Sequence, residues 1–137
     1  MPAQTSKTPD FALRLEGVAL GYGDFTVLRD ISMDVRAGQV VAIMGGSGSG
    51  KTTLLRAATG QLTAQRGRVL AFGQDMAHVS RTELQSLRKR MGVLFQQGAL
   101  FTDLNVFENV AFPLREHTKL TEPEVTERVL DKLDAVG

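Results

Sequence analysis

Residues 45–52, with the sequence GGSGSGKT, constrain the fold more than any other part of the chain. They fit the pattern G-x-x-x-x-G-K-[ST] at every fixed position. The apolar run 40–44 precedes them, and a helix-forming stretch from Lys51 to about Thr59 follows. A continuous apolar run is typical of a strand buried on both faces of a parallel sheet. This strand–loop–helix order predicts an α/β fold with a glycine-rich loop at the start of a helix.

The loop has the chemistry of a phosphate cradle. Glycines let the backbone curl so that successive N–H groups point inward, and the helix start adds unpaired N–H groups and a positive dipole end. Lys51 can reach the β- and γ-oxygens of a nucleotide, and the Thr52 hydroxyl is a hard ligand suited to Mg²⁺. The alternative is a flexible glycine-rich linker. The expected nucleotide-binding residues are Gly45, Gly46, Ser47, Gly48, Ser49, Gly50, Lys51, Thr52 and Thr53.

The composition narrows the class of protein. A net charge of +1 in 137 residues argues against a nucleic-acid surface, and the absence of cysteine excludes disulfides and thiolate metal sites. The apolar runs are too short to cross a bilayer. Residues 1–10 are polar with Pro2 and Pro9, so we expect a mobile tail, no export signal and one domain over 11–137. A soluble cytoplasmic protein is the simplest interpretation.

Periodicity and capping patterns predict the remaining elements. Alternating apolar residues predict strands over 11–20 and 27–35, and short apolar runs predict strands over 68–72 and 93–95. Capping boxes predict helices after Ser80, with Leu84, Leu87 and Met91 on its apolar side, and after Thr121. A shorter helix is expected over 105–112. The helix after Thr121 carries an apolar stripe of Val125, Val129, Leu133 and Val136.

Three further segments accompany the loop in order: LGYG at 20–23, MGVLFQQGALF at 91–101 and NVFENV at 105–110. With the loop, they make the chain from about Phe11 to Gly137 resemble the ATP-binding subunits of ABC transporters. The resemblance implies a P-loop NTPase (RecA-like) core with an N-terminal antiparallel β subdomain and the start of a helical subdomain. It also implies ATP as the nucleotide and Mg²⁺ as its metal ion.

The same resemblance assigns two residues outside the loop. Tyr22 stands where the family places an aromatic ring that stacks on adenine; the alternative is a turn tyrosine with its hydroxyl in water. Gln96 falls on the glutamine that completes the Mg²⁺ shell and senses the γ-phosphate, so it joins Lys51 as a catalytic candidate and Thr52 as a metal ligand. The alternative is a capping or surface amide, and the neighbouring Gln97 is the less favoured assignment.

The resemblance also implies partners and a location. Phe101, Leu104, Phe107 and Phe112 fall where the helical subdomain grips a membrane permease, although each could instead be core. The segments around 95–101 and 107–116 look most like the ATPases of MCE-linked bacterial phospholipid transporters. This implies ATP-driven lipid transport, a second ATPase subunit as homodimer partner, a permease, an MCE-type lipid-binding protein and no nucleic acid. The protein would lie in the cytoplasm on the inner face of the inner membrane.

The sequence also departs from the family. A complete subunit is roughly twice as long and carries a serine-glycine-glycine signature loop, an Asp-Glu strand end and a switch histidine. His78 and His117 are not in that context and are expected at the surface. We therefore expect an incomplete ABC ATPase domain, the first part of a longer protein, with negligible ATP turnover as written. The alternatives are a truncated remnant, an importer ATPase for another substrate, or a soluble ABC protein of DNA repair or translation.

Overall fold

The computed structural model describes residues 11–137, and the expected tail over 1–10 lies outside the described residues. The chain divides into two compact units. One reaches to Met91 and the other is Gly92–Gly137. The first unit contains the glycine-rich loop and the second contains Gln96.

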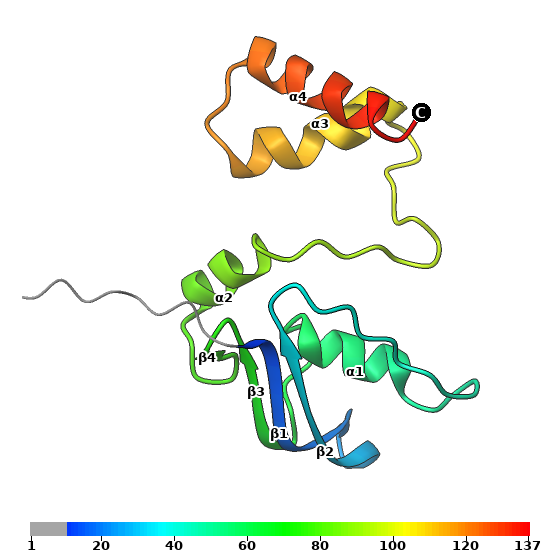
Figure 1. Cartoon of the computed structure of the whole chain (residues 1–137), viewed down its shortest axis with the longest axis vertical. Coiled ribbons are helices and arrows are strands. Elements are labelled where there is room, and N and C mark those ends of the chain that lie inside the picture. The colour runs from blue at the N-terminus through cyan, green and yellow to red at the C-terminus, as the bar shows by residue number, and fades with distance from the viewer. Residues whose placement is uncertain (1–10) are drawn as a thin grey trace, which may run out of the picture. The chain divides into compact units, whose positions relative to one another are not determined.

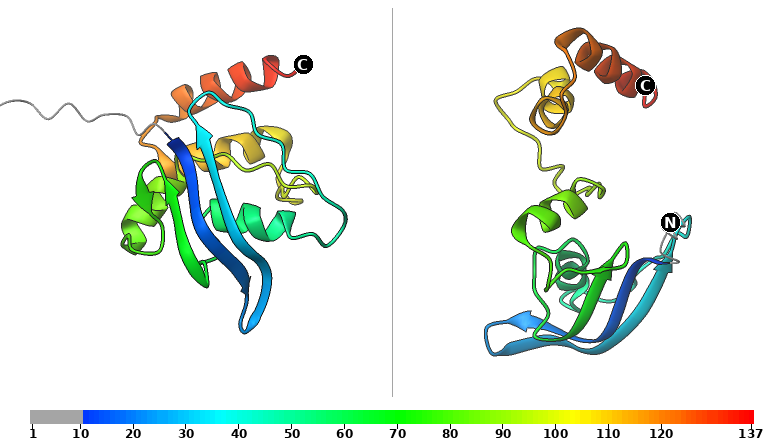
Figure 2. Two further views of the ribbon diagram at one scale, coloured as in Figure 1. Left: turned by 60° about the horizontal axis from the view of Figure 1, so that its bottom comes forward. Right: turned by 90° about the vertical axis from the view of Figure 1, so that its left-hand side faces the viewer.

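An antiparallel sheet of four strands forms the first unit. Its strands are β1 Phe11–Tyr22, β2 Phe25–Arg36, β3 Arg66–Ala71 and β4 Gln74–Asp75, in the spatial order β2-β1-β3-β4. Strands β1 and β2 form a long curved hairpin (Figure 2) whose register ends with Tyr22 opposite Phe25. The strands predicted over 11–20 and 27–35 are confirmed, as is the N-terminal antiparallel β subdomain that the family resemblance implied.

Two helices accompany the sheet in the first unit (Figure 1). Helix α1, Lys51–Ala58, contacts β1 and β3, and helix α2, Arg81–Arg88, begins at the predicted capping box. In that box the Ser80 hydroxyl accepts from the N–H of Glu83, and the Glu83 carboxylate accepts from the N–H of Ser80. The shared core consists of Leu15, Val18, Leu20, Leu54, Ala57, Val69, Ala71, Met76 and Leu87.

The predictions of strands over 40–44 and 93–95 are wrong for this structure. Both segments are irregular; the Val40 and Met44 side chains are 96% and 91% exposed, and that of Leu94 is 89% exposed. The sheet of the described residues is antiparallel and includes neither segment. A strand with apolar residues on both faces gains stability only when strands pair beside it and other layers cover it. Without such neighbours, the apolar run forms a loop that leads into α1.

Two helices packed against each other form the helical part of the second unit. Helix α3, Val106–His117, and helix α4, Glu122–Asp134, enclose a core of Ala111, Val125 and Val129. Helix α3 runs past its expected end near 112, through Pro113, because Leu114 in its later half also packs against this core. The predicted stripe on α4 is confirmed for its first three members, whereas Val136 lies beyond the helix and is 84% exposed.

Candidate phosphate-binding site

Lys51 organises the glycine-rich loop. Its Nζ donates to the carbonyl oxygens of Gly45 and Gly46, both at 2.6 Å, and to the Ser49 hydroxyl at 3.3 Å. The N–H of Ser49 donates to the Gly46 carbonyl at 3.3 Å, which closes a turn inside the loop. The ammonium group therefore holds the backbone in an arc around itself, at the start of α1.

The N-terminus of α1 is open to an anion. Gly50 is the N-cap, with φ 92°, and no side chain caps the helix. The first intrahelical bond runs from the N–H of Leu54 to the Gly50 carbonyl, so the preceding N–H groups have no carbonyl partner within the helix. The first turn carries no acidic residue that would repel an anion. Unpaired N–H groups and the positive end of the helix dipole favour a phosphate at this position.

The two threonines after Lys51 differ in environment. Thr52 is exposed in the first turn of α1, so its hydroxyl is accessible to a hard cation such as Mg²⁺ held between protein and phosphate. The Thr53 side chain is buried, with 6% of the residue exposed. Its hydroxyl is therefore not accessible in the way that of Thr52 is, and the role of Thr53 in the nucleotide site stays a prediction.

Tyr22 lies at the last position of β1, and 45% of the residue is exposed. Its hydroxyl accepts a hydrogen bond from Nη1 of Arg56 at 3.0 Å. Hydrogen bonding with the Thr53 side chain, and then with Arg56, lowers the pKa of the phenol below its usual 10.0. Both partners belong to α1, the helix that begins at the loop. Sequence reasoning missed Arg56, for which the only available signal was its position one turn beyond Thr52 on an expected helix.

Gln96 and Gln97 lie in a turn of the second unit, where the N–H of Gly98 donates to the Phe95 carbonyl at 3.0 Å. Both glutamines are exposed. Because Gln96 and the loop belong to different units, the role of Gln96 as a Mg²⁺ ligand and catalytic residue stays a prediction.

An aromatic pair is exposed in the second unit. The Phe101 and Phe112 rings lie 4.8 Å apart and are 49% and 41% exposed, whereas Phe107 packs against the α3–α4 core. Asn109 fixes the segment before α3: its Oδ1 accepts from the N–H of Phe101 and its Nδ2 donates to the carbonyl of Leu104. Phe107 therefore belongs to the core, whereas docking by Phe101 and Phe112 stays a prediction.

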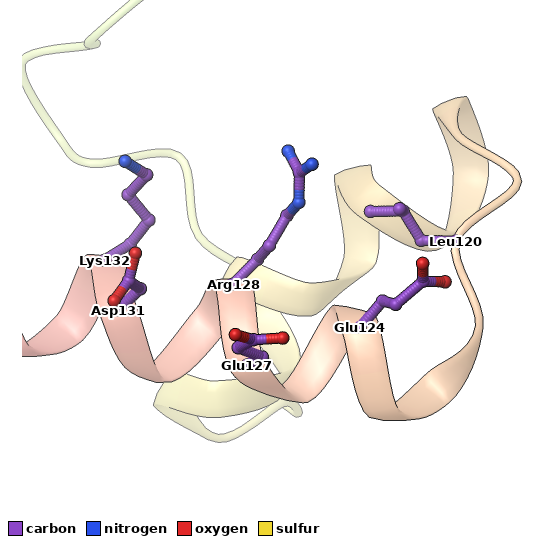
Figure 3. Close-up of a pocket in the computed structure, with 6 residues that line it drawn as sticks. All are labelled: Leu120, Glu124, Glu127, Arg128, Asp131 and Lys132. Carbon is purple, nitrogen blue, oxygen red and sulfur yellow. The ribbon is translucent and has the colours of Figure 1, made fainter.

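A hollow of about 390 Å³ runs along α4 (Figure 3). Its lining is charged and mixed in sign, and Arg128 and Lys132 extend on the same side of the helix. Such a lining is typical of a solvated helix face.

His78 and His117 are exposed, as predicted, and His78 contacts Asp75 at 3.0 Å. Residues 11–137 include no group of three potential metal ligands of the His, Cys, Asp or Glu type and no helix that could span a membrane.

The fold and loop together define a nucleotide-binding protein of the phosphate-loop class. The family described as ABC transporter matches residues 28–137. The chain belongs to this family, as the sequence motifs indicated.

Three relatives show which ABC transporter ATP-binding proteins the chain is similar to. An intermembrane phospholipid transport system ATP-binding protein, MlaF, of Haemophilus influenzae is 48% identical over 125 residues, which are 91% of this chain and 47% of that protein. The MlaF of Escherichia coli K12 is 49% identical over 90% of this chain and 46% of its own. A probable ribonucleotide transport ATP-binding protein, mkl, of Mycobacterium leprae is 41% identical over 92% of this chain and 36% of its own. The chain thus spans less than half the length of these relatives.

Solved structures confirm the fold class. The ATP-binding cassette MJ0796, in a dimeric post-hydrolysis state bound to ADP and Pi, aligns with a TM-score of 0.79 at 28% identity over 89% of this chain and 56% of that chain. The cbiO1 protein of Clostridium perfringens, part of the transporter complex cbiONQ, aligns with a TM-score of 0.78 at 34% identity over 91% of this chain and 50% of that one. The chain therefore has the fold of part of an ABC ATPase domain.

Proposed function

We propose that this chain binds ATP together with Mg²⁺ as the N-terminal portion, residues 11–137, of an ABC transport ATPase. The observation that carries the proposal is the loop itself. The Lys51 ammonium lies at the centre of an arc of backbone, next to an uncapped helix start without acidic side chains. This arrangement supplies positive charge and N–H donors within a small volume, which a triphosphate requires.

Each residue of the loop has a distinct part in the proposed site. Lys51 exchanges its contacts with the Gly45 and Gly46 carbonyls for the β- and γ-oxygens. The N–H groups at the start of α1 hold the remaining phosphate charge, and the Thr52 hydroxyl and Gln96 are the proposed metal ligands. When bound, Mg²⁺ neutralises phosphate charge and favours transfer of the γ-phosphoryl group to water. In the complete ATPase, Lys51 and Gln96 stabilise that step, whereas this chain alone binds ATP with negligible turnover.

The proposed cargo is phospholipid moved between bacterial membranes. Its support is the 48–49% identity with proteins named for intermembrane phospholipid transport, against 41% with the mycobacterial protein named for ribonucleotide transport. The proposed partners are a second ATPase subunit, a membrane permease and an MCE-type lipid-binding protein. We infer that the protein lies in the cytoplasm on the inner face of the inner membrane, held there by the permease.

Titration calorimetry with MgATP and the 137-residue chain tests the nucleotide site. Lys51→Ala removes a charged hydrogen-bond donor worth about 1.5–3 kcal/mol, so ATP should bind about 10- to 150-fold more weakly. Lys89→Ala, at the end of α2, is the matched control and should bind like the parent chain. Unfolding midpoints of all three proteins establish that the loss is local. Equal ATP affinity of Lys51→Ala and the parent chain would refute the assignment.

A cellular experiment tests the cargo. Cells whose gene carries Lys51→Ala should lose transfer of labelled phospholipid between inner- and outer-membrane fractions, and Lys89→Ala should retain it. Unchanged phospholipid transfer with impaired uptake of another solute would assign the ATPase to a different transporter.

A further inference from the structure

The hairpin end that carries Tyr22 is held from two sides. On one side, Arg56 of α1 donates from Nη1 to the Tyr22 hydroxyl at 3.0 Å. On the other side, Gln65 donates from Nε2 to the Gly23 carbonyl at 2.7 Å and accepts from the Thr26 hydroxyl at 2.9 Å. The N–H of Gln65 also donates to the Ala19 carbonyl at 2.9 Å. The turn is therefore tied both to α1 and to the segment that follows α1, although its residues are largely exposed.

Arg56 has no ion-pair partner in the part of the chain that the structure describes. The ion pairs among residues 11–137 involve Arg14, Arg68, His78 and Arg115 as cations. The guanidinium of Arg56, itself exposed, is instead directed to the phenol oxygen. An exposed arginine gains little stability from a single neutral acceptor in water. Its contact with Tyr22 therefore has more consequence for the orientation of the ring than for the stability of the fold.

We propose that Arg56 is a positioning residue that fixes the Tyr22 ring for the base of the nucleotide. The proposal rests on the ATP-binding function proposed above. A ring tethered through its hydroxyl keeps its face in one orientation, so the base stacks on it without first ordering the side chain. Because Arg56 and the phosphate-binding Lys51 lie on one short helix, α1 sets the distance between the base platform and the phosphate loop.

Calorimetry with two probes separates this role from phosphate binding. The probes are MgATP, which carries a base, and magnesium tripolyphosphate, which does not. Ordering one side chain costs about two- to tenfold in affinity, so Arg56→Met should weaken MgATP binding by that factor and leave tripolyphosphate binding unchanged. Arg56→Lys, which keeps the charge and a donor, should restore part of the loss. Arg81→Met, on the exposed start of α2, is the matched control.

A double-mutant cycle identifies the route of the effect. Tyr22→Phe keeps the ring and removes the hydroxyl that contacts both Arg56 and Thr53, so it should weaken MgATP binding at least as much as Arg56→Met. Adding Arg56→Met to Tyr22→Phe should then weaken MgATP binding no further. Tyr22 is the only tyrosine and the chain has no tryptophan, so ultraviolet titration follows this one phenol. Hydrogen bonding with Thr53, and then with Arg56, lowers the pKa of this phenol in the parent chain, so Arg56→Met should raise its apparent pKa part of the way toward the usual value.

The outcomes are distinguishable. If Arg56→Met weakens MgATP and tripolyphosphate equally, or loses the same factor again in the Tyr22→Phe background, Arg56 does not act through the ring and the proposal is overturned. An unchanged MgATP affinity of Arg56→Met overturns it as well. Failure of the parent chain to bind either probe refutes the proposed ATP-binding function itself.

Discussion

Three glycines of the phosphate loop offer a graded test of how the fold builds the site. A methyl group added at Gly46 would meet no atom within 4 Å, and the backbone there has no positive φ. At Gly48 the space is also open, but φ is +75°. At Gly50, φ is +92° and the added carbon would lie 2.8–3.1 Å from three carbons of Leu28. An added methyl group should therefore meet no obstacle at Gly46, backbone strain alone at Gly48, and both strain and a steric clash at Gly50.

The expected costs follow from these geometries. Gly46→Ala should change the free energy of unfolding by less than about 0.5 kcal/mol, as for most surface changes. Gly48→Ala should lose about 1–2 kcal/mol, the cost of a positive φ for a residue with a Cβ. Gly50→Ala adds to this strain an overpacking cost of about 1–3 kcal/mol, because Leu28 packs against the core, for a total of about 2–5 kcal/mol.

Urea unfolding followed by circular dichroism measures the three stabilities, and calorimetry with MgATP measures the site. Gly50→Ala should lose ATP binding most strongly, since the strain and the clash both act on the N-cap of α1. Gly46→Ala should retain most of the affinity, because position 46 is variable in the loop pattern. Equal stabilities of the Gly46 and Gly50 variants would refute the geometry of the loop and its packing on Leu28.

Two further predictions concern ion pairs. Burial raises the pKa of the Asp75 carboxyl, but hydrogen bonds from Arg68, Ala77 and His78 outweigh burial and lower the pKa below 3.8. The contribution of Asp75 to the stability of the fold is therefore present above the unfolded pKa and is lost as pH falls through the folded pKa. Asp75→Asn should therefore weaken the acid dependence of the unfolding free energy below about pH 4, and an unchanged acid limb would contradict this. Arg115 bridges Glu108 at 2.6 Å and Glu122 at 2.9 Å, so Arg115→Met should lower the unfolding midpoint of the α3–α4 pair slightly in low salt and less in 1 M salt, which screens exposed ion pairs. A loss that does not change with salt would indicate that packing, not charge, is responsible.

Local signals explain what the sequence predicted well. The capping box at Ser80 depends on residues three positions apart, so it can be identified without knowledge of the fold. The phosphate loop is equally local, because Lys51 contacts carbonyls five and six positions before it. The alternation of β1 reports one buried and one exposed face of an antiparallel sheet, which is a property of each strand.

The features that the sequence could not supply depend on distant partners. The strand predicted over 40–44 required neighbours on both sides, and no periodicity reports whether such neighbours exist. The contact between Arg56 and Tyr22 spans 34 positions, and neither residue type marks the other as its partner. The place of Gln96 relative to the loop depends on how two units are joined, which no local pattern encodes.

The two ends of the phosphate loop are held in different ways. The end that joins α1 is firmly placed, because Gly50 is buried beside Leu28. Two residues of α1, Leu54 and Ala57, also belong to the core. On the N-terminal side of the loop, residues 40–49 are exposed, and the arc of backbone around Lys51 is held mainly by the hydrogen bonds of that residue. A triphosphate that draws Lys51 away from these carbonyls must therefore replace the contacts that order the arc. We therefore expect the N–H donors at the start of α1 to be preorganised for phosphate, whereas the arc must exchange its contacts with Lys51 for contacts with the phosphates. This exchange should reduce the affinity of the chain relative to a cradle that needs no rearrangement.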